Sequence, residues 1–248
     1  LNFDNIPNYK YINDRFKNLG FDPKNEYSVP YMWGTVGILY NKDLVKEPVK
    51  SWDILWDKKY KDQILMLNSQ RDSIGVALKK LGYSMNSTND KELEQAKQEL
   101  IKQKPLVFSY IGDEGRDIMI NDEATLSVVW SGDAAYAMQE NPKLDYAIPE
   151  EGTNYWFDNM VIPKTSKNKK AAEQFINFLC RPEVAVKNAE YIGYAIPNVE
   201  GVKELPKEIT ENKVLYPEEK DLKNVDVFVD LGEYIKKYDK IWTEIVAQ

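Results

Sequence analysis

The chain reads Ser28-Val29-Pro30-Tyr31-Met32-Trp33-Gly34-Thr35-Val36-Gly37-Ile38-Leu39-Tyr40-Asn41, an extended apolar run with a proline near its start and an asparagine at its end. This pattern predicts a long strand. Two glycines inside it, Gly34 and Gly37, indicate that another backbone or a ligand approaches the strand closely.

Strand-like runs and helical patterns alternate outward from this stretch. Further strands are predicted at 63–67, 106–110, 125–130, 146–149 and 159–163. Helices are predicted at 52–56, 74–81, 115–121, 134–139, 168–180, 182–191 and 230–248, and another runs from a cap at Asn89 or Asp90 to about 102. Residues 68–73 form a polar turn, and 152–158 form another. The alternation predicts an α/β fold with mostly parallel sheets.

The composition excludes several classes of function. Thirty-three Lys and Arg residues against forty Asp and Glu give a net charge of −7, which disfavours nucleic acid or an anionic membrane as partner and tolerates a cationic ligand. Histidine is absent, which removes the Ser-His-Asp triad, the Cys-His dyad and the HExxH zinc helix. No metal-ligand cluster, Walker motif or GxGxxG pattern occurs, so no metal and no cofactor are expected.

The single cysteine and the start of the chain bear on the compartment. Cys180 cannot form an internal disulfide and is expected to be a buried small hydrophobe. No apolar run approaches the ~20 residues of a membrane span, and no signal peptide stands at Leu1. Because the chain begins abruptly, we expect its N-terminus to be processed or truncated. A cysteine-poor chain suits the cytoplasm and bacterial export alike.

Acids and indoles follow several of the predicted strands. These residues are Asp72, Trp130 with Asp133, and Trp156 with Asp158. Ligands of open α/β sheets bind at the carboxyl ends of strands. Indole faces attract cations and cover methylene groups, and carboxylates bind ammonium groups through charge-assisted hydrogen bonds. The set is therefore complementary to a polyamine.

Each of these residues also has a purely structural interpretation. Trp130 can pack in the core, as we expect for Trp33, Trp52 and Trp56. Asp133 can cap a helix, Asp158 can form a turn, and Asp72 can pair with Arg71 in solvent. Paired carboxylates also serve glycosidases, so a carboxylate-dependent hydrolase is an alternative of another class.

Seven motifs occur in order along the chain: YSVPYMWGT at 27–35, SWDILW at 51–56, LGYS at 81–84, WSGD at 130–133, YWFD at 155–158, KAAEQFINFLCRPEVA at 170–185 and IGYAIPN at 192–198. Together they resemble the bacterial extracellular solute-binding proteins of ABC importers, and within them the spermidine/putrescine-binding members. The resemblance covers essentially the whole chain.

The resemblance implies a type II periplasmic-binding-protein-like fold of two α/β lobes with a hinge. We expect a residual first lobe at 1–32 and 159–201 and a second lobe at 33–158 and 202–248. The first lobe is expected to be incomplete, because family members have a further βα segment before the match to Leu1. The implied protein is extracytoplasmic, lipid- or membrane-anchored, and no enzyme. It closes around a polyamine and docks on a membrane permease.

The resemblance also assigns roles to particular residues. Trp130 and Trp156 would be aromatic walls, and Tyr194 would line the cleft. Asp158 and Asp72 would each pair with an amine, and Asp133 matches an acid of putrescine-specific relatives. Ser69 and Phe228 depart from some relatives, which carry an acid and an amide there, so they bear on which polyamine fits. Another solute, such as a sugar or an iron complex, is the alternative within the fold, and the lack of histidine disfavours iron.

Overall fold

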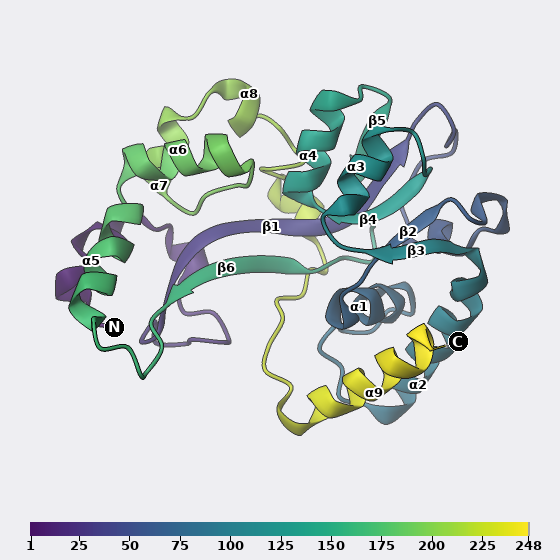
Figure 1. Ribbon diagram of the computed structural model, residues 1–248, viewed down its shortest axis with the longest axis horizontal. Helices are drawn as coiled ribbons and strands as arrows, with labels where there is room; N and C mark the ends of the chain where they lie inside the picture. The colour runs from purple at the N-terminus through teal and green to yellow at the C-terminus, as the bar shows by residue number, and fades with distance from the viewer. Residues whose placement is uncertain (248) are drawn as a thin grey trace. The chain divides into compact units, whose positions relative to one another are not determined.

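The computed structural model describes residues 1–247, and the chain in it divides into two compact units (Figure 1). Unit 1 comprises Leu1–Gly34 and Trp156–Pro217, and unit 2 comprises Thr35–Tyr155 and the chain from Glu218 onward. The chain therefore passes between the units within strand β1 (Ser28–Asn41), at the start of strand β6 (Tyr155–Val161), and after Pro217.

Unit 2 is built on a mixed sheet. Its other strands are β2 (Ile64–Leu67), β3 (Val107–Ile111), β4 (Leu126–Trp130) and β5 (Leu144–Ala147). The strand order is β3-β2-β4-β1-β5, and β6 pairs with β1 outside this path. Strand β2 runs parallel to β3 and β4, whereas β1 runs antiparallel to β4 and β5.

The expectation of a mostly parallel sheet is therefore wrong, because β1 pairs in antiparallel orientation with both β4 and β5. A parallel neighbour needs a long crossover connection, usually a helix. Between β1 and β2 the chain forms only two short 3₁₀ helices, η4 (Trp52–Trp56) and η5 (Lys58–Tyr60), and no helix separates β5 from β6. The alternation that predicts parallel pairing holds only for the part of the chain from β2 to β4.

Helices cover both faces of this sheet. Figure 1 shows α1 (Gln70–Lys80), α2 (Asp90–Gln103) and α9 (Ile235–Val246) together on one face, and α3 (Glu114–Ile120) and α4 (Ser131–Glu140) on the other. The first group shares an apolar cluster with little or no solvent exposure: Ile74, Ala77, Leu78, Leu93, Ala96, Leu100, Leu231, Tyr238, Ile241 and Ile245. Removal of this apolar surface from water is the main force that holds the group together.

The close approach of β5 to β1 explains why residue 37 is a glycine. A Cβ atom at this position would lie 2.4 Å from the Tyr146 ring and 2.6 Å from the carbonyl oxygen of Ala147 on β5. The expected close contact of another backbone with the first strand is confirmed here. Trp33 and Trp52 are fully buried, as expected of core residues, and Trp56 is partly buried.

Two elements begin earlier than the sequence pattern predicts. Helix α1 starts at Gln70 instead of Ile74, because Ser69 Oγ accepts a hydrogen bond from the backbone N–H of Asp72 and caps the helix. Strand β6 starts at Tyr155, so the predicted turn ends before it and Asp158 lies inside the strand.

Unit 1 contains the N-terminal 3₁₀ helices η1 (Phe3–Asn5), η2 (Pro7–Tyr11) and η3 (Asp14–Phe16), and helices α5 (Lys169–Leu179), α6 (Pro182–Ile192), α7 (Val199–Glu204) and α8 (Lys207–Thr210). Its core includes Met32, Ala185, Ala189, Ile196 and Leu205. Cys180 is buried, as expected.

The buried Glu173 ties the first residues to α5. Its carboxylate accepts hydrogen bonds from the Asn2 N–H (2.8 Å) and Asn5 Nδ2 (2.7 Å), and Lys169 Nζ lies 2.8 Å away.

The unit boundaries differ from the expected ones at 32, 158 and 201. The largest difference concerns residues 202–217, which belong to unit 1. Val202, Leu205, Ile209 and Tyr216 pack against the cluster around Met32, so their apolar faces keep this segment in unit 1. The remaining 3₁₀ helices, η6 (Lys104–Leu106), η7 (Glu219–Leu222) and η8 (Gly232–Tyr234), lie in unit 2. No helix within residues 1–247 is long and apolar enough to cross a membrane.

Candidate functional site

The six candidate residues are divided evenly between the two units. Asp72, Trp130 and Asp133 belong to unit 2, and Trp156, Asp158 and Tyr194 belong to unit 1. Each group is described within its own unit.

Trp130 lies at the carboxyl end of β4, opposite Val36 of β1. Its indole is half-buried, and the chain turns directly into α4 at Ser131. Ser131 Oγ accepts a hydrogen bond of 3.2 Å from the Thr35 N–H, which fixes this strand end to β1. Trp130 therefore stands at the place where open α/β sheets bind ligands, as predicted.

Asp133 lies in the first turn of α4, where the partial positive charge of the helix N-terminus favours a carboxylate. It is not the capping residue, because the N-cap position is held by Trp130. The Asp133 side chain is 12% exposed, and its Oδ1 lies 3.6 Å from Nη1 of Arg116 on α3. This acid thus already has a cation of the protein beside it.

Asp72 is only 6% exposed. The alternative interpretation, in which Asp72 pairs with Arg71 in solvent, is therefore wrong. Its carboxylate accepts hydrogen bonds from Ser69 Oγ (2.7 Å) and Asn154 Nδ2 (3.1 Å), both of which are neutral donors. Within residues 1–247 it forms no ion pair. Burial raises the pKa of the Asp72 carboxyl, since a desolvated carboxylate is costly to charge.

Trp156 and Tyr194 come together in unit 1. Their ring centroids lie 5.2 Å apart with an interplanar angle of 86°, an edge-to-face contact. Both side chains are half-buried. The contact joins β6 to the segment after α6, and it brings together two residues that are separate in the sequence.

Asp158 lies two residues after Trp156 on β6, and side chains two apart on a strand share a face. Its interpretation as a turn residue is wrong, since β6 continues to Val161. Part of the side chain is exposed, yet the surrounding protein removes enough water to raise the pKa of the carboxyl. No residue within 1–247 gives it a hydrogen bond or an ion pair.

Two further residues of the site are missed by sequence reasoning. Tyr31 on β1 lies close enough to Asp158 for the carboxylate to help burial raise the pKa of the tyrosine. Asn154 is 2% exposed and donates a hydrogen bond to Asp72, which lies 82 residues earlier in the chain. The alternation along β1 could have suggested Tyr31, but nothing in the sequence near Asn154 marks its contact.

The two groups share one chemical property. Asp72 in unit 2 and Asp158 in unit 1 are carboxylates that form no ion pair within residues 1–247, and each unit also contributes a half-buried indole. Within the described residues, no group of three or more histidine, cysteine, aspartate or glutamate side chains is arranged to hold a metal ion. The arrangement is suited to a ligand that is cationic and partly apolar.

Comparisons with known proteins agree on the family. Residues 1–217 match the family described as bacterial extracellular solute-binding protein. The spermidine/putrescine-binding periplasmic protein of Escherichia coli is 37% identical over 243 residues, which cover 98% of this chain and 70% of that protein. A putrescine-binding periplasmic protein of Pseudomonas aeruginosa is 31% identical over 265 residues, with 99% of this chain and 72% of that protein covered.

Solved structures agree on the fold. An ABC transporter protein from Listeria monocytogenes superposes with a TM-score of 0.95 at 44% identity, covering 99% of this chain and 77% of the other. The spermidine/putrescine ABC transporter substrate-binding protein of Streptococcus pneumoniae gives a TM-score of 0.88 at 38% identity, covering 100% of this chain and 77% of the other. The predicted periplasmic-binding-protein-like fold is confirmed.

Proposed function

The chain belongs to the bacterial extracellular solute-binding protein family, and from that premise we propose that it captures a polyamine, putrescine or spermidine, for an ABC importer. As a member of this family it works outside the cytoplasm as a binding protein and not as an enzyme. Its relative from Escherichia coli is described as binding spermidine and putrescine, and its relative from Pseudomonas aeruginosa as binding putrescine, which supports the proposal.

The observation that carries the proposal is that two carboxylates, Asp72 in unit 2 and Asp158 in unit 1, form no ion pair within the described residues. Putrescine and spermidine carry ammonium groups separated by methylene chains. We assign one ammonium group to Asp158 and another to Asp72, each held by a charge-assisted hydrogen bond. Closure of the protein around the ligand would produce the form that docks on the membrane permease.

Trp130 and Trp156 are assigned to the apolar part of the ligand. An indole attracts a nearby ammonium group by a cation–π interaction of up to about 2 kcal/mol when desolvated, and its apolar body covers methylene groups. Tyr194 positions Trp156 through the edge-to-face contact. Asp133 stays in the proposed site, with a smaller contribution to binding, because Arg116 already offsets part of its charge.

The alternatives fit this arrangement less well. A neutral sugar would stack on the indoles but would leave two desolvated carboxylates without a counter-charge, which is unfavourable. The described residues contain no group of three or more histidine, cysteine, aspartate or glutamate side chains arranged to hold a metal, which leaves an iron complex without a matching ligand set of these types. The family is one of binding proteins, which leaves the carboxylate-dependent hydrolase without support.

Titration calorimetry tests the proposal directly. Putrescine, spermidine, a neutral disaccharide and ferric citrate are titrated into the protein under one set of conditions. We expect saturable one-to-one binding of at least one polyamine and no measurable binding of the disaccharide or the iron complex. Absence of binding for both polyamines, or tighter binding of either control compound, would refute the proposed function.

A further inference from the structure

Arg71 directly precedes Asp72, yet its guanidinium is held elsewhere. Nη2 donates a hydrogen bond of 2.8 Å to Asn86 Oδ1, and Nη1 donates one of 3.3 Å to the carbonyl oxygen of Val229. The guanidinium also lies 4.2 Å from the centroid of the Phe228 ring. Within residues 1–247 no ion pair joins Arg71 to Asp72, although the two are adjacent in the first turn of α1.

Adjacency in a helix does not by itself prevent such a pair. Helix α3 contains the same Arg-Asp sequence at Arg116 and Asp117, and there Arg116 Nε lies 3.1 Å from Asp117 Oδ1. Arg71 differs in having partners that fix it in another direction. The comparison indicates that the contacts of Arg71, and not the spacing of the two residues, keep it from Asp72.

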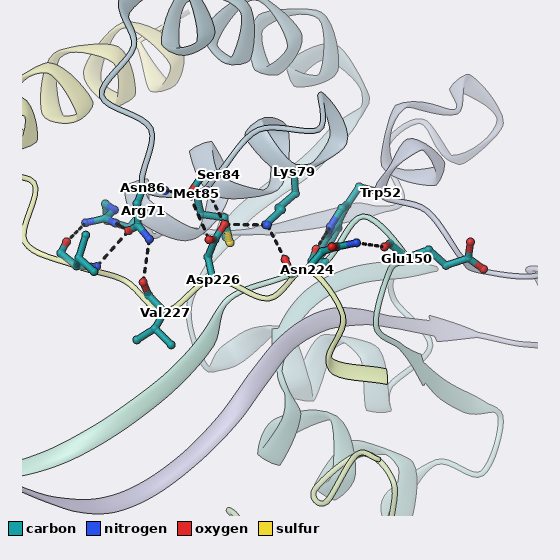
Figure 2. A network of polar contacts seen from close by, with 12 residues as sticks. Trp52, Arg71, Lys79, Ser84, Met85, Asn86, Glu150, Asn224, Asp226 and Val227 are labelled. Carbon is teal, nitrogen blue, oxygen red and sulfur yellow. Dashed lines mark hydrogen bonds and ion pairs between the residues drawn. The ribbon is translucent and has the colours of Figure 1, made fainter. Parts of the chain in front are cut away.

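Asn86 is the centre of those contacts, as Figure 2 shows. Its Oδ1 accepts from Arg71 Nη2 and from the Val229 N–H (3.1 Å), and its Nδ2 donates to the Val227 carbonyl oxygen (2.8 Å). Asn86 thereby fixes the backbone on both sides of Phe228, so that this ring stays against the guanidinium.

Asp226 fixes the start of the same segment. Its carboxylate accepts from the Met85 N–H (2.9 Å) and Ser84 Oγ (3.2 Å), and Lys79 Nζ lies 2.8 Å away (Figure 2). Its backbone N–H donates to the Thr153 carbonyl oxygen at 2.9 Å. We call residues 226–229 the strap, since these contacts hold it along unit 2 and leave Phe228 little freedom to move.

The placement of Arg71 is costly for the folded protein. Its Nε is buried without a hydrogen-bond partner, and so is the Oδ1 atom of Asn154 beside Asp72. Unpartnered buried polar atoms destabilise a fold, and a buried carboxylate is stabilised by a nearby cation. A direct Arg71–Asp72 pair would give both groups a charged partner, whereas the observed arrangement gives Arg71 only neutral acceptors and the rings of Phe228 and Tyr238. Such local violations are typical of functional sites.

We propose that Asn86 and the strap residue Phe228 hold the Arg71 guanidinium away from Asp72, and so reserve Asp72 for an ammonium group of the ligand. This inference rests on the proposed polyamine function. Asn86 and Phe228 are positioning residues in it, because they act on Asp72 through Arg71, whatever effect Phe228 also has on which polyamine fits. A guanidinium released toward Asp72 would compete with the ligand for the same carboxylate.

Four forms of the protein test the proposal: the unchanged chain, Asn86→Ala, Arg71→Met, and the double variant. Polyamine affinity is measured by titration calorimetry. We expect Asn86→Ala to weaken binding about tenfold or more, whereas Arg71→Met stays within about threefold of the unchanged chain, each tenfold step being 1.4 kcal/mol. The double variant should regain the affinity of Arg71→Met, because the competing cation is gone. Asn121→Ala, at the exposed end of α3, is the control and should have no effect.

A second measurement does not depend on the ligand. The pKa of the Asp72 carboxyl, followed by NMR, should fall in Asn86→Ala as Arg71 approaches, and should rise again in the double variant. If the unchanged chain binds no polyamine, the proposed function fails, while this titration still tests the displacement of Arg71. Phe228→Leu replaces Asn86→Ala in both measurements if that variant does not fold.

Three results would overturn the inference. The first is a double variant that binds as weakly as Asn86→Ala, which would mean that Asn86 acts through the fold and not through Arg71. The second is a large loss of binding in Arg71→Met. The third is an Asp72 pKa that does not change when Asn86 or Phe228 is replaced.

Discussion

Replacement of Asp158 by asparagine separates binding from folding more cleanly than any other change in the proposed site. The Asp158 carboxylate has no hydrogen bond or ion pair within residues 1–247, so the substitution breaks no contact of the ligand-free protein. Asp72 is a poorer choice, because an asparagine there would turn a second amide toward Asn154 Nδ2 and Ser69 Oγ, which now donate to it.

The expected loss follows from the environment of the carboxylate. Removal of one partner of a desolvated charge pair costs about 2–5 kcal/mol, whereas an exposed pair contributes only about 0.2–1 kcal/mol. Asp158 is partly exposed in the ligand-free chain and partly desolvated, which favours the lower end of the first range. A loss of about 2 kcal/mol corresponds to roughly 30-fold weaker binding.

Titration calorimetry with putrescine and spermidine measures this loss, and a thermal melt without ligand checks the fold. Glu190→Gln, an exposed acid on α6 of the same unit, is the matched control for the lost negative charge. We expect the control to bind normally and Asp158→Asn to melt like the unchanged chain. Equal affinity of Asp158→Asn and the control for both polyamines would show that the carboxylate does not contact the ligand.

The other predictions concern pH and packing. Burial raises the pKa of both Asp72 and Asp158, so each carboxyl takes up a proton at a higher pH than an ordinary aspartate does. On acidification, polyamine affinity should therefore begin to fall at a higher pH than it would for ordinary aspartates. A calorimetric pH series in which polyamine affinity stays constant would contradict this. Without ligand, the stability of the protein should change with pH in the opposite direction to polyamine affinity. The native state binds the Asp72 proton more tightly than the unfolded chain does, so the contribution of Asp72 to the free energy of unfolding should increase as pH falls through its native pKa. Leu100→Ala should lower the free energy of unfolding by about 2–5 kcal/mol in a urea titration, since the side chain is fully buried between α1, α2 and α9; a loss below 1 kcal/mol would argue against this packing. Gly37→Ala should destabilise by about 1–3 kcal/mol through overlap with Tyr146 and β5, and a normal thermal melt would contradict the register of β1 and β5.

Local signals were sufficient where one segment determines its own structure. The apolar run from Ser28 to Asn41 forms β1 with the predicted bounds, and η4 and α2 lie within one residue of their predicted ranges, with Ser51 and Asn89 as their N-caps. These features depend on neighbours within a few residues, which periodicity and capping patterns describe directly.

Other features depend on distant partners and could not be predicted. The burial of Asp72 requires Asn154, and the antiparallel pairing of β1 depends on strands that follow 85 or more residues later, such as β4 with Val36 opposite Trp130. Trp130 ends a strand, as predicted, whereas Asp158 was predicted to lie in a turn and only the structure shows that it lies within β6.

Both units are discontinuous in the chain, and this has a consequence for synthesis. The core of unit 2 needs Tyr238, Ile241 and Ile245 from α9, although its first strand is made some two hundred residues earlier. Domains that are continuous usually fold one after another as they leave the ribosome. Here neither unit can close on its own first segment, and the apolar cluster of α1 and α2 stays exposed on the nascent chain until residues 235–246 have been made. Premature termination within α9 would leave that apolar cluster open to solvent, which favours aggregation over a folded fragment.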